Sequence, residues 1–107
     1  MAAKKTESLY DKTIRWTFAD GPTAGMTFEH IFHKDGSVDW KSLKGEKTRE
    51  KHAAATKVAE GVFAVSYLGA KGYTLTTILD FHSMKMVGFA SNEKQWSQQK
   101  GTFEIVA

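Results

Sequence analysis

The chain has 107 residues, of which 41% are hydrophobic; this is enough for one domain with a single modest core but not for a second domain. It contains no cysteine, which excludes disulfides, thiolate nucleophiles and sulfur-ligated metals. Its 15 basic and 12 acidic residues leave a net charge of +3, a small excess for a protein that would neutralise nucleic-acid phosphates.

Neither a membrane nor a nucleic acid is indicated as a partner. No stretch approaches the roughly 20 consecutive apolar residues of a membrane-spanning helix. Residues 1–12 carry charges without an apolar run behind them, so we expect a soluble, cytoplasmic protein in which this N-terminal segment is poorly ordered or loosely attached. Basic residues gather between Lys41 and Lys57, but Glu46 and Glu50 interrupt them, which is typical of a solvated face.

A period of two runs along almost the whole chain, so we expect β-strands joined by short turns. Glycines with Asp, Pro, Lys or Ser beside them end most of the runs and supply the turns. The predicted strands run from Thr13 to Ala19, Met26 to His33, Ser37 to Leu43, Ala54 to Ala59, Val62 to Leu68, Tyr73 to Phe81, Met84 to Ser91 and Thr102 to Val106. Residues 92–100 are polar apart from Trp96 and are expected to connect the last two strands.

Short strands with no apolar helix to cover them predict an all-β fold, because a flat sheet would leave its edges exposed. We expect residues 1–107 to form a single eight-stranded antiparallel β-barrel, mostly an up-and-down meander. A five-stranded oligonucleotide-binding barrel is the alternative architecture, and it would require several strands to merge.

The hairpin around Asp35-Gly36 is the most informative stretch, because its first arm places the imidazole of His30 between two phenylalanines on one face. A two-residue turn would place His30 opposite Lys41, with Lys41 on the same inner face. A three-residue turn would place His30 opposite Trp40 and direct Lys41 to the other side. The hydrophobic pattern favours the three-residue turn, and both registers stay open at this point.

The segment from Glu46 to Glu60 is ambiguous. Its run Ala53-Ala54-Ala55 favours a helix by propensity. The apolar residues are small and clustered, however, and would give a helix no convincing buried stripe. We expect a charged loop that leads into a short strand, with a helix as the open alternative.

Three runs of sequence carry a resemblance to a known family: GMTFEHIFHKDGSVDWK, VAEGVFAVSYLGAKGYTLTTILDF and GFAS. In this order they resemble the small MoaF-like proteins, named for a molybdenum-cofactor biosynthesis protein, and they are distantly similar to phenolic acid decarboxylases. Both groups are lipocalin-like (calycin) barrels, so the resemblance, which covers residues 13–106, implies that fold. It implies little about function, since MoaF-like proteins have no well-defined activity.

The decarboxylase comparison implies a site inside the barrel, built from two tyrosines, an inward arginine and a glutamate. The resemblance places Trp16 and Phe18 at the tyrosines, Lys41 at the arginine and Glu60 at the glutamate. Only the glutamate is retained: phenylalanine cannot hydrogen-bond a substrate carboxylate as a phenol can, and lysine is a point charge where arginine offers a planar fork. We expect decarboxylation of phenolic acids to be absent or very weak and do not favour an enzyme, although an altered lyase step using Glu60 and Lys41 stays open.

The candidate ligand-binding residues are Trp16, Phe18, Phe28, His30, Lys41 and Glu60. The candidate catalytic groups among them are His30, Lys41 and Glu60. Each has a structural alternative: a core histidine, core aromatics, and a surface turn for the glutamate. No metal or cofactor is predicted, because His30 and His33 would face opposite sides of a strand and phosphate-binding motifs are missing.

Three functions are compatible with these residues. The leading one is a barrel that binds a small aromatic or anionic molecule in an aromatic-lined interior. The others are an enzyme of decarboxylase-like ancestry with altered chemistry, and a nucleic-acid or protein-interaction module. The outward face of the second strand, where Ile31 is the large apolar residue, is a candidate homodimer contact.

Overall fold

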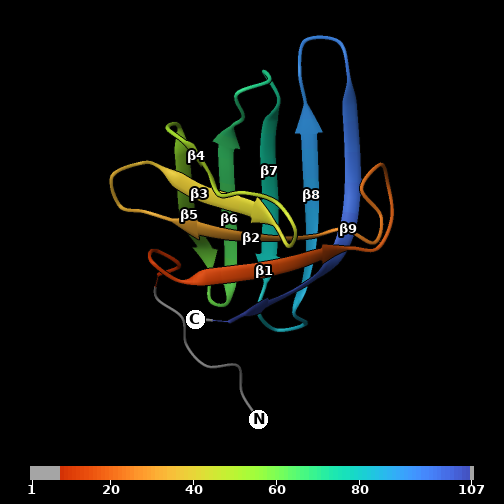
Figure 1. Ribbon diagram of the computed structural model, residues 1–107. Helices are drawn as coiled ribbons and strands as arrows, with labels where there is room; N and C mark the ends of the chain where they lie inside the picture. The colour runs from red at the N-terminus through yellow and green to blue at the C-terminus, as the bar shows by residue number, and fades with distance from the viewer. Residues whose placement is uncertain (1–7, 107) are drawn as a thin grey trace.

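The computed structural model describes residues 8–106, which form nine antiparallel strands in one sheet (Figure 1). The strands are β1 (Thr13–Phe18), β2 (Thr27–Phe32), β3 (Val38–Ser42), β4 (Thr48–Glu50), β5 (Ala53–Ala59), β6 (Val62–Leu68), β7 (Thr74–Asp80), β8 (Lys85–Ser91) and β9 (Trp96–Ile105). Their order in the sheet is β4-β3-β2-β1-β9-β8-β7-β6-β5. Apart from the pair β1 and β9, neighbours in the sheet are neighbours in sequence, which is a meander. Among the described residues, no helix has the length and apolar character needed to cross a lipid bilayer.

The sheet curls into a nearly closed barrel, in which β1, β2 and β3 cross in front of β5 to β8 (Figure 1). The long strand β9 joins the two halves, since it pairs with β8 on one side and with β1 on the other. A Cβ added at Gly101 would lie 2.1 Å from the carbonyl oxygen of Thr17, so glycine permits the close approach of β1. No ladder joins the edge strands β4 and β5, but the N–H of Ala53 donates to the carbonyl of Gly36 (2.9 Å) near this gap.

The predicted all-β antiparallel barrel is therefore confirmed, with nine strands instead of eight. The additional strand is β4, which together with β5 occupies the ambiguous segment, so the helical alternative there is wrong. Strand β9 starts at Trp96, well before the predicted Thr102. Its first half was missed because Gln98 points to solvent while Gln99 is buried, so polar residues occupy both faces.

The β2–β3 hairpin takes the three-residue register. Phe32 pairs with Val38, and His30 pairs with Trp40. The turn is closed by a hydrogen bond from the N–H of His33 to the carbonyl of Ser37 (2.9 Å), and Gly36 adopts a φ of +90° that favours glycine. The register that the hydrophobic pattern favoured is confirmed, and the two-residue alternative, which would place Lys41 on the inner face, is wrong for this chain.

The start of the described chain is attached to the barrel. Leu9 is 1% exposed within the core, and the N–H of Asp11 donates to the carbonyl of Phe32 (2.8 Å). The loose attachment predicted for residues 1–12 is therefore wrong for residues 8–12. The remainder of that prediction, residues 1–7, lies outside the described residues.

The barrel is packed at one end and hollow at the other. At the packed end, Phe81 makes edge-on contacts with Phe63 and Phe103, with ring centroids 5.8 and 5.0 Å apart. Between β7 and β8, the inward pair Leu79 and Met86 at the packed end is followed by two smaller pairs, Thr77 opposite Gly88 and Leu75 opposite Ala90. Because Gly88 and Ala90 have little or no side chain, β8 leaves space there.

Candidate functional site

A cavity of about 1040 Å³ occupies the hollow end of the barrel. Its aromatic lining comes from both halves of the sheet and from the β6–β7 connection: Trp16, Phe18, Phe28, Trp40, Tyr67, Tyr73, Phe89 and Trp96. The lining extends from His30, which is 2% exposed, to Trp96, which is 67% exposed, so the cavity opens to solvent. Pockets for small molecules usually measure roughly 300–1,000 Å³ and are mostly apolar with a few polar groups. This cavity has that size and character.

His30 forms part of the cavity floor. Its ring stacks on Trp16, with centroids 3.8 Å apart, and its Nε2 lies 3.0 Å from the hydroxyl of Tyr67. Burial lowers the pKa of His30 to about 3, so the imidazole is neutral at physiological pH. Its Nδ1 is buried and has no hydrogen-bond partner within residues 8–106. A histidine with so low a pKa is a weak general base, which argues against the catalytic role considered for it.

Tyr67 stays protonated beside His30. Burial, and then the negative charge of Glu50, raise the pKa of the Tyr67 phenol. The Tyr67 hydroxyl can therefore donate to an acceptor as well as receive a hydrogen bond. It provides a neutral polar group at the inner end of the cavity.

Glu50 is the carboxylate of the cavity. It is 7% exposed, and its Oε2 accepts hydrogen bonds from the indole Nε1 of Trp40 (3.1 Å) and, at a longer 3.4 Å, from the N–H of Ala70. Among the ion pairs of the described chain, none involves Glu50. A buried carboxylate therefore lines an aromatic cavity and is held by neutral donors.

Gln99 attaches the β1–β2 loop to one wall. It is 7% exposed, and its Nε2 donates to the carbonyl of Asp20 (2.9 Å) and to the hydroxyl of Thr23 (2.6 Å). The N–H of Lys100 donates to a carboxylate oxygen of Asp20 (2.7 Å). Since Pro22 and Thr23 line the cavity, these bonds determine the position of part of its rim.

Four of the six predicted ligand-binding residues line the cavity: Trp16, Phe18, Phe28 and His30. Lys41 does not, because the three-residue turn pairs it with Glu29 on the outer face. Glu60 does not either; it lies in the β5–β6 turn, 52% exposed in its side chain, with Oε2 2.8 Å from Nζ of Lys57. Of the candidate catalytic groups His30, Lys41 and Glu60, the cavity lining therefore includes His30 and neither of the other two.

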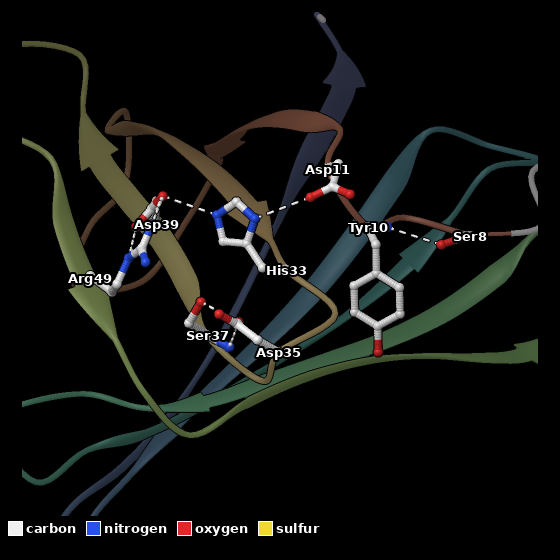
Figure 2. A network of polar contacts seen from close by, with 8 residues as sticks. All are labelled: Ser8, Tyr10, Asp11, His33, Asp35, Ser37, Asp39 and Arg49. Atoms are coloured by element: carbon white, nitrogen blue, oxygen red, sulfur yellow. Dashed lines mark hydrogen bonds and ion pairs between the residues drawn. The ribbon is translucent and has the colours of Figure 1, made fainter.

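His33 lies on the outer face of the barrel and His30 on the inner face, as the strand geometry predicted. Figure 2 shows its Nδ1 beside Asp11 (3.1 Å) and its Nε2 beside Asp39 (3.0 Å). Arg49 donates two further hydrogen bonds to Asp39, of 2.8 and 3.0 Å. The hydrogen bonds to Asp39 and then Asp11 raise the pKa of His33, and those from Arg49 and then His33 hold the pKa of Asp39 well below its usual range. Within residues 8–106, no group of three or more His, Asp or Glu side chains is arranged to hold a metal ion.

Among the cavity residues that the sequence did not indicate are Trp40, Glu50, Tyr67 and Gln99. Trp40 follows from the three-residue register, and Tyr67 from the alternation Phe63, Val65, Tyr67 along β6. Glu50 could be found only by predicting β4, which has three residues and no apolar side chain. Gln99 lies in the polar run of residues 97–100, where no alternation of apolar side chains indicates which residues face inward.

The comparisons with known proteins agree with this fold. The crystal structure of a "putative beta-lactamase" from Burkholderia vietnamiensis superposes with a TM-score of 0.74 at 16% identity, covering 96% of this chain and 99% of that one. At this identity the likeness concerns the fold alone. No curated protein sequence matches the chain. The sequence model of the MoaF N-terminal domain matches residues 1–95, and the chain therefore belongs to the MoaF N-terminal domain family.

Proposed function

We propose that this domain binds a small, largely aromatic molecule in the cavity at the hollow end of the barrel. The observation that carries the proposal is the unfilled volume of about 1040 Å³ behind an aromatic lining. Protein interiors are normally packed to the density of organic crystals, so a cavity of this size with an open mouth is suited to a ligand.

A decarboxylase-like reaction has weaker support. Of the four positions that the resemblance pairs with that active site, Lys41 and Glu60 lie outside the cavity. The two that line it, Trp16 and Phe18, have no hydroxyl with which to bind a substrate carboxylate. An anionic ligand is also disfavoured, because the carboxylate of Glu50 is a buried acidic group of the lining, while buried His30 is neutral and supplies no positive charge.

The proposal can be tested by tryptophan fluorescence, because all three tryptophans of the chain, Trp16, Trp40 and Trp96, line the cavity. Titration with 3-phenylpropanol, a neutral aromatic probe, should give a saturable change in emission. Ala90→Phe adds a ring to the inward face of β8 and should weaken binding at least about tenfold by filling the cavity.

The matched control is Ala54→Phe, which adds the same ring at an exposed position of β5 outside the lining. It should leave the affinity unchanged. Absence of a saturable signal in the wild type, or equal affinity in wild type and Ala90→Phe, would contradict the proposal.

A further inference from the structure

We propose that the ligand of this cavity is an organic cation, an ammonium group carried on an aromatic or apolar body, and that Glu50 is the group that recognises it. This inference rests on the proposed function and specifies its ligand class. The juxtaposition that supports it is a carboxylate that is more than nine-tenths buried, has no ion pair with any described residue and lines a cavity with aromatic walls.

Glu50 is a buried acidic side chain with no ion pair to any described residue. Carboxylates that are almost fully buried in proteins are normally paired with a cation, because removing them from water is unfavourable. Asp39, on the neighbouring strand, follows this rule through Arg49 and His33. Among residues 8–106, the partners of Glu50 are the indole of Trp40 and, at a longer distance, the backbone N–H of Ala70. A cationic ligand would supply the missing partner.

Aromatic side chains form the cavity walls around this carboxylate. The indole of Trp40 donates a hydrogen bond to Glu50. The rings of Trp40 and Phe28 pack edge-on, with centroids 6.3 Å apart, so the aromatic surface continues from Trp40 to Phe28. Tyr67 lines the same cavity, and the charge of Glu50 contributes to its raised pKa. Aromatic faces attract cations through their quadrupole, most strongly when water is excluded. A carboxylate among such rings suits an ammonium group better than a neutral polar group.

The cavity lining also contains one histidine and two lysines. His30 is neutral in the cavity and does not compete for Glu50. Lys71 and Lys94 also line the cavity, but both are exposed residues near its mouth, where solvent screens their charge. The charge pattern of the cavity is therefore a buried anion with cations at the solvent side.

The experiment uses three probes that share one body: 3-phenylpropylamine, which is an ammonium ion at neutral pH, 3-phenylpropanol and 3-phenylpropionate. Calorimetric titration of the wild type should show the amine binding at least about tenfold more tightly than the alcohol, with the carboxylate weakest. Glu50→Gln should abolish the preference for the amine and keep the affinity for the alcohol. Glu46→Gln, which removes the same charge from an exposed position between β3 and β4, should leave all three affinities unchanged.

A second measurement does not depend on a variant. The indole N–H resonance of Trp40 reports on the hydrogen bond to Glu50, so the amine should shift it more than the alcohol does at equal saturation. If the alcohol binds but the amine is not preferred, or if Glu50→Gln keeps the preference, the cation proposal is overturned and the cavity proposal stands. If none of the three probes binds, both are overturned.

Discussion

The two faces of the barrel wall around β2, β3 and β4 each carry one histidine and one buried carboxylate, and they use them differently. On the outer face, His33 and Asp39 bond to each other, and Arg49 completes the charge balance (Figure 2). On the inner face, His30 and Glu50 form no bond to each other; His30 bonds to Tyr67 and Glu50 to Trp40. The outer carboxylate is paired with cationic side chains of the protein itself, whereas the inner carboxylate has no ion pair with a described residue.

The difference separates polar groups that stabilise the fold from polar groups available to a ligand. Asp39 and Glu50 are almost equally buried, at 5% and 7% exposure, so burial alone does not distinguish them. What distinguishes them is the partner: a guanidinium for Asp39 and neutral N–H groups for Glu50. A buried group that the fold leaves without a charge partner is the better candidate for function.

The largest effect is expected for the outer carboxylate. Asp39→Ala removes the acceptor of three charge-assisted hydrogen bonds and should lower the free energy of unfolding by about 2–3 kcal/mol in urea denaturation. Glu29→Ala, which breaks the ion pair between Arg15 and a less deeply buried carboxylate on the same outer face, is the control and should cost less than about 1 kcal/mol. Equal effects of the two changes would show that Asp39 is no more structural than a surface residue.

The two histidines should change the free energy of unfolding over different ranges of pH. His30 has a lowered pKa, so stability is lost as the pH falls below its ordinary 6.5, by about 1.4 kcal/mol per pH unit and about 2 kcal/mol by pH 5. His33 has a raised pKa, so its contribution is complete below 6.5 and is lost as the pH rises through the folded-state pKa. The second effect should be under about 1 kcal/mol because His33 is partly exposed.

Urea denaturation across this pH range checks both windows. His30→Gln should make the free energy of unfolding less dependent on pH below 6.5. His33→Asn should make it less dependent on pH above 6.5. An acid slope that persists in His30→Gln would contradict the assignment of a buried, neutral His30.

The fold was largely predictable because alternation of apolar residues is local. The strand around Phe28, His30 and Phe32 and the hairpin register both followed from the requirement that large apolar residues share one face. Strand β4 was missed because Thr48, Arg49 and Glu50 carry no apolar signal, and their position is set by pairing with β3.

The site was predictable only in its aromatic half. Trp16, Phe18 and Phe28 lie on predictable inward positions of β1 and β2. Lys41 and Glu60 were selected through a family resemblance, and a one-residue difference in register is enough to place Lys41 on the outer face. The hollow end depends on Gly88 and Ala90, whose small size matters only once the opposite wall is known.

The most direct test of the whole account measures the unfolding free energies of the wild type and Glu50→Gln, each with and without 3-phenylpropylamine. Without the amine, Glu50→Gln should be as stable as the wild type or more stable by about 1 kcal/mol, because a buried carboxylate without a cation is replaced by a neutral side chain that can still accept from Trp40. With the amine, the wild type should gain more stability than the variant. A Glu50→Gln protein that is clearly less stable without the amine, and gains as much from it as the wild type does, would contradict the claim that Glu50 serves a ligand.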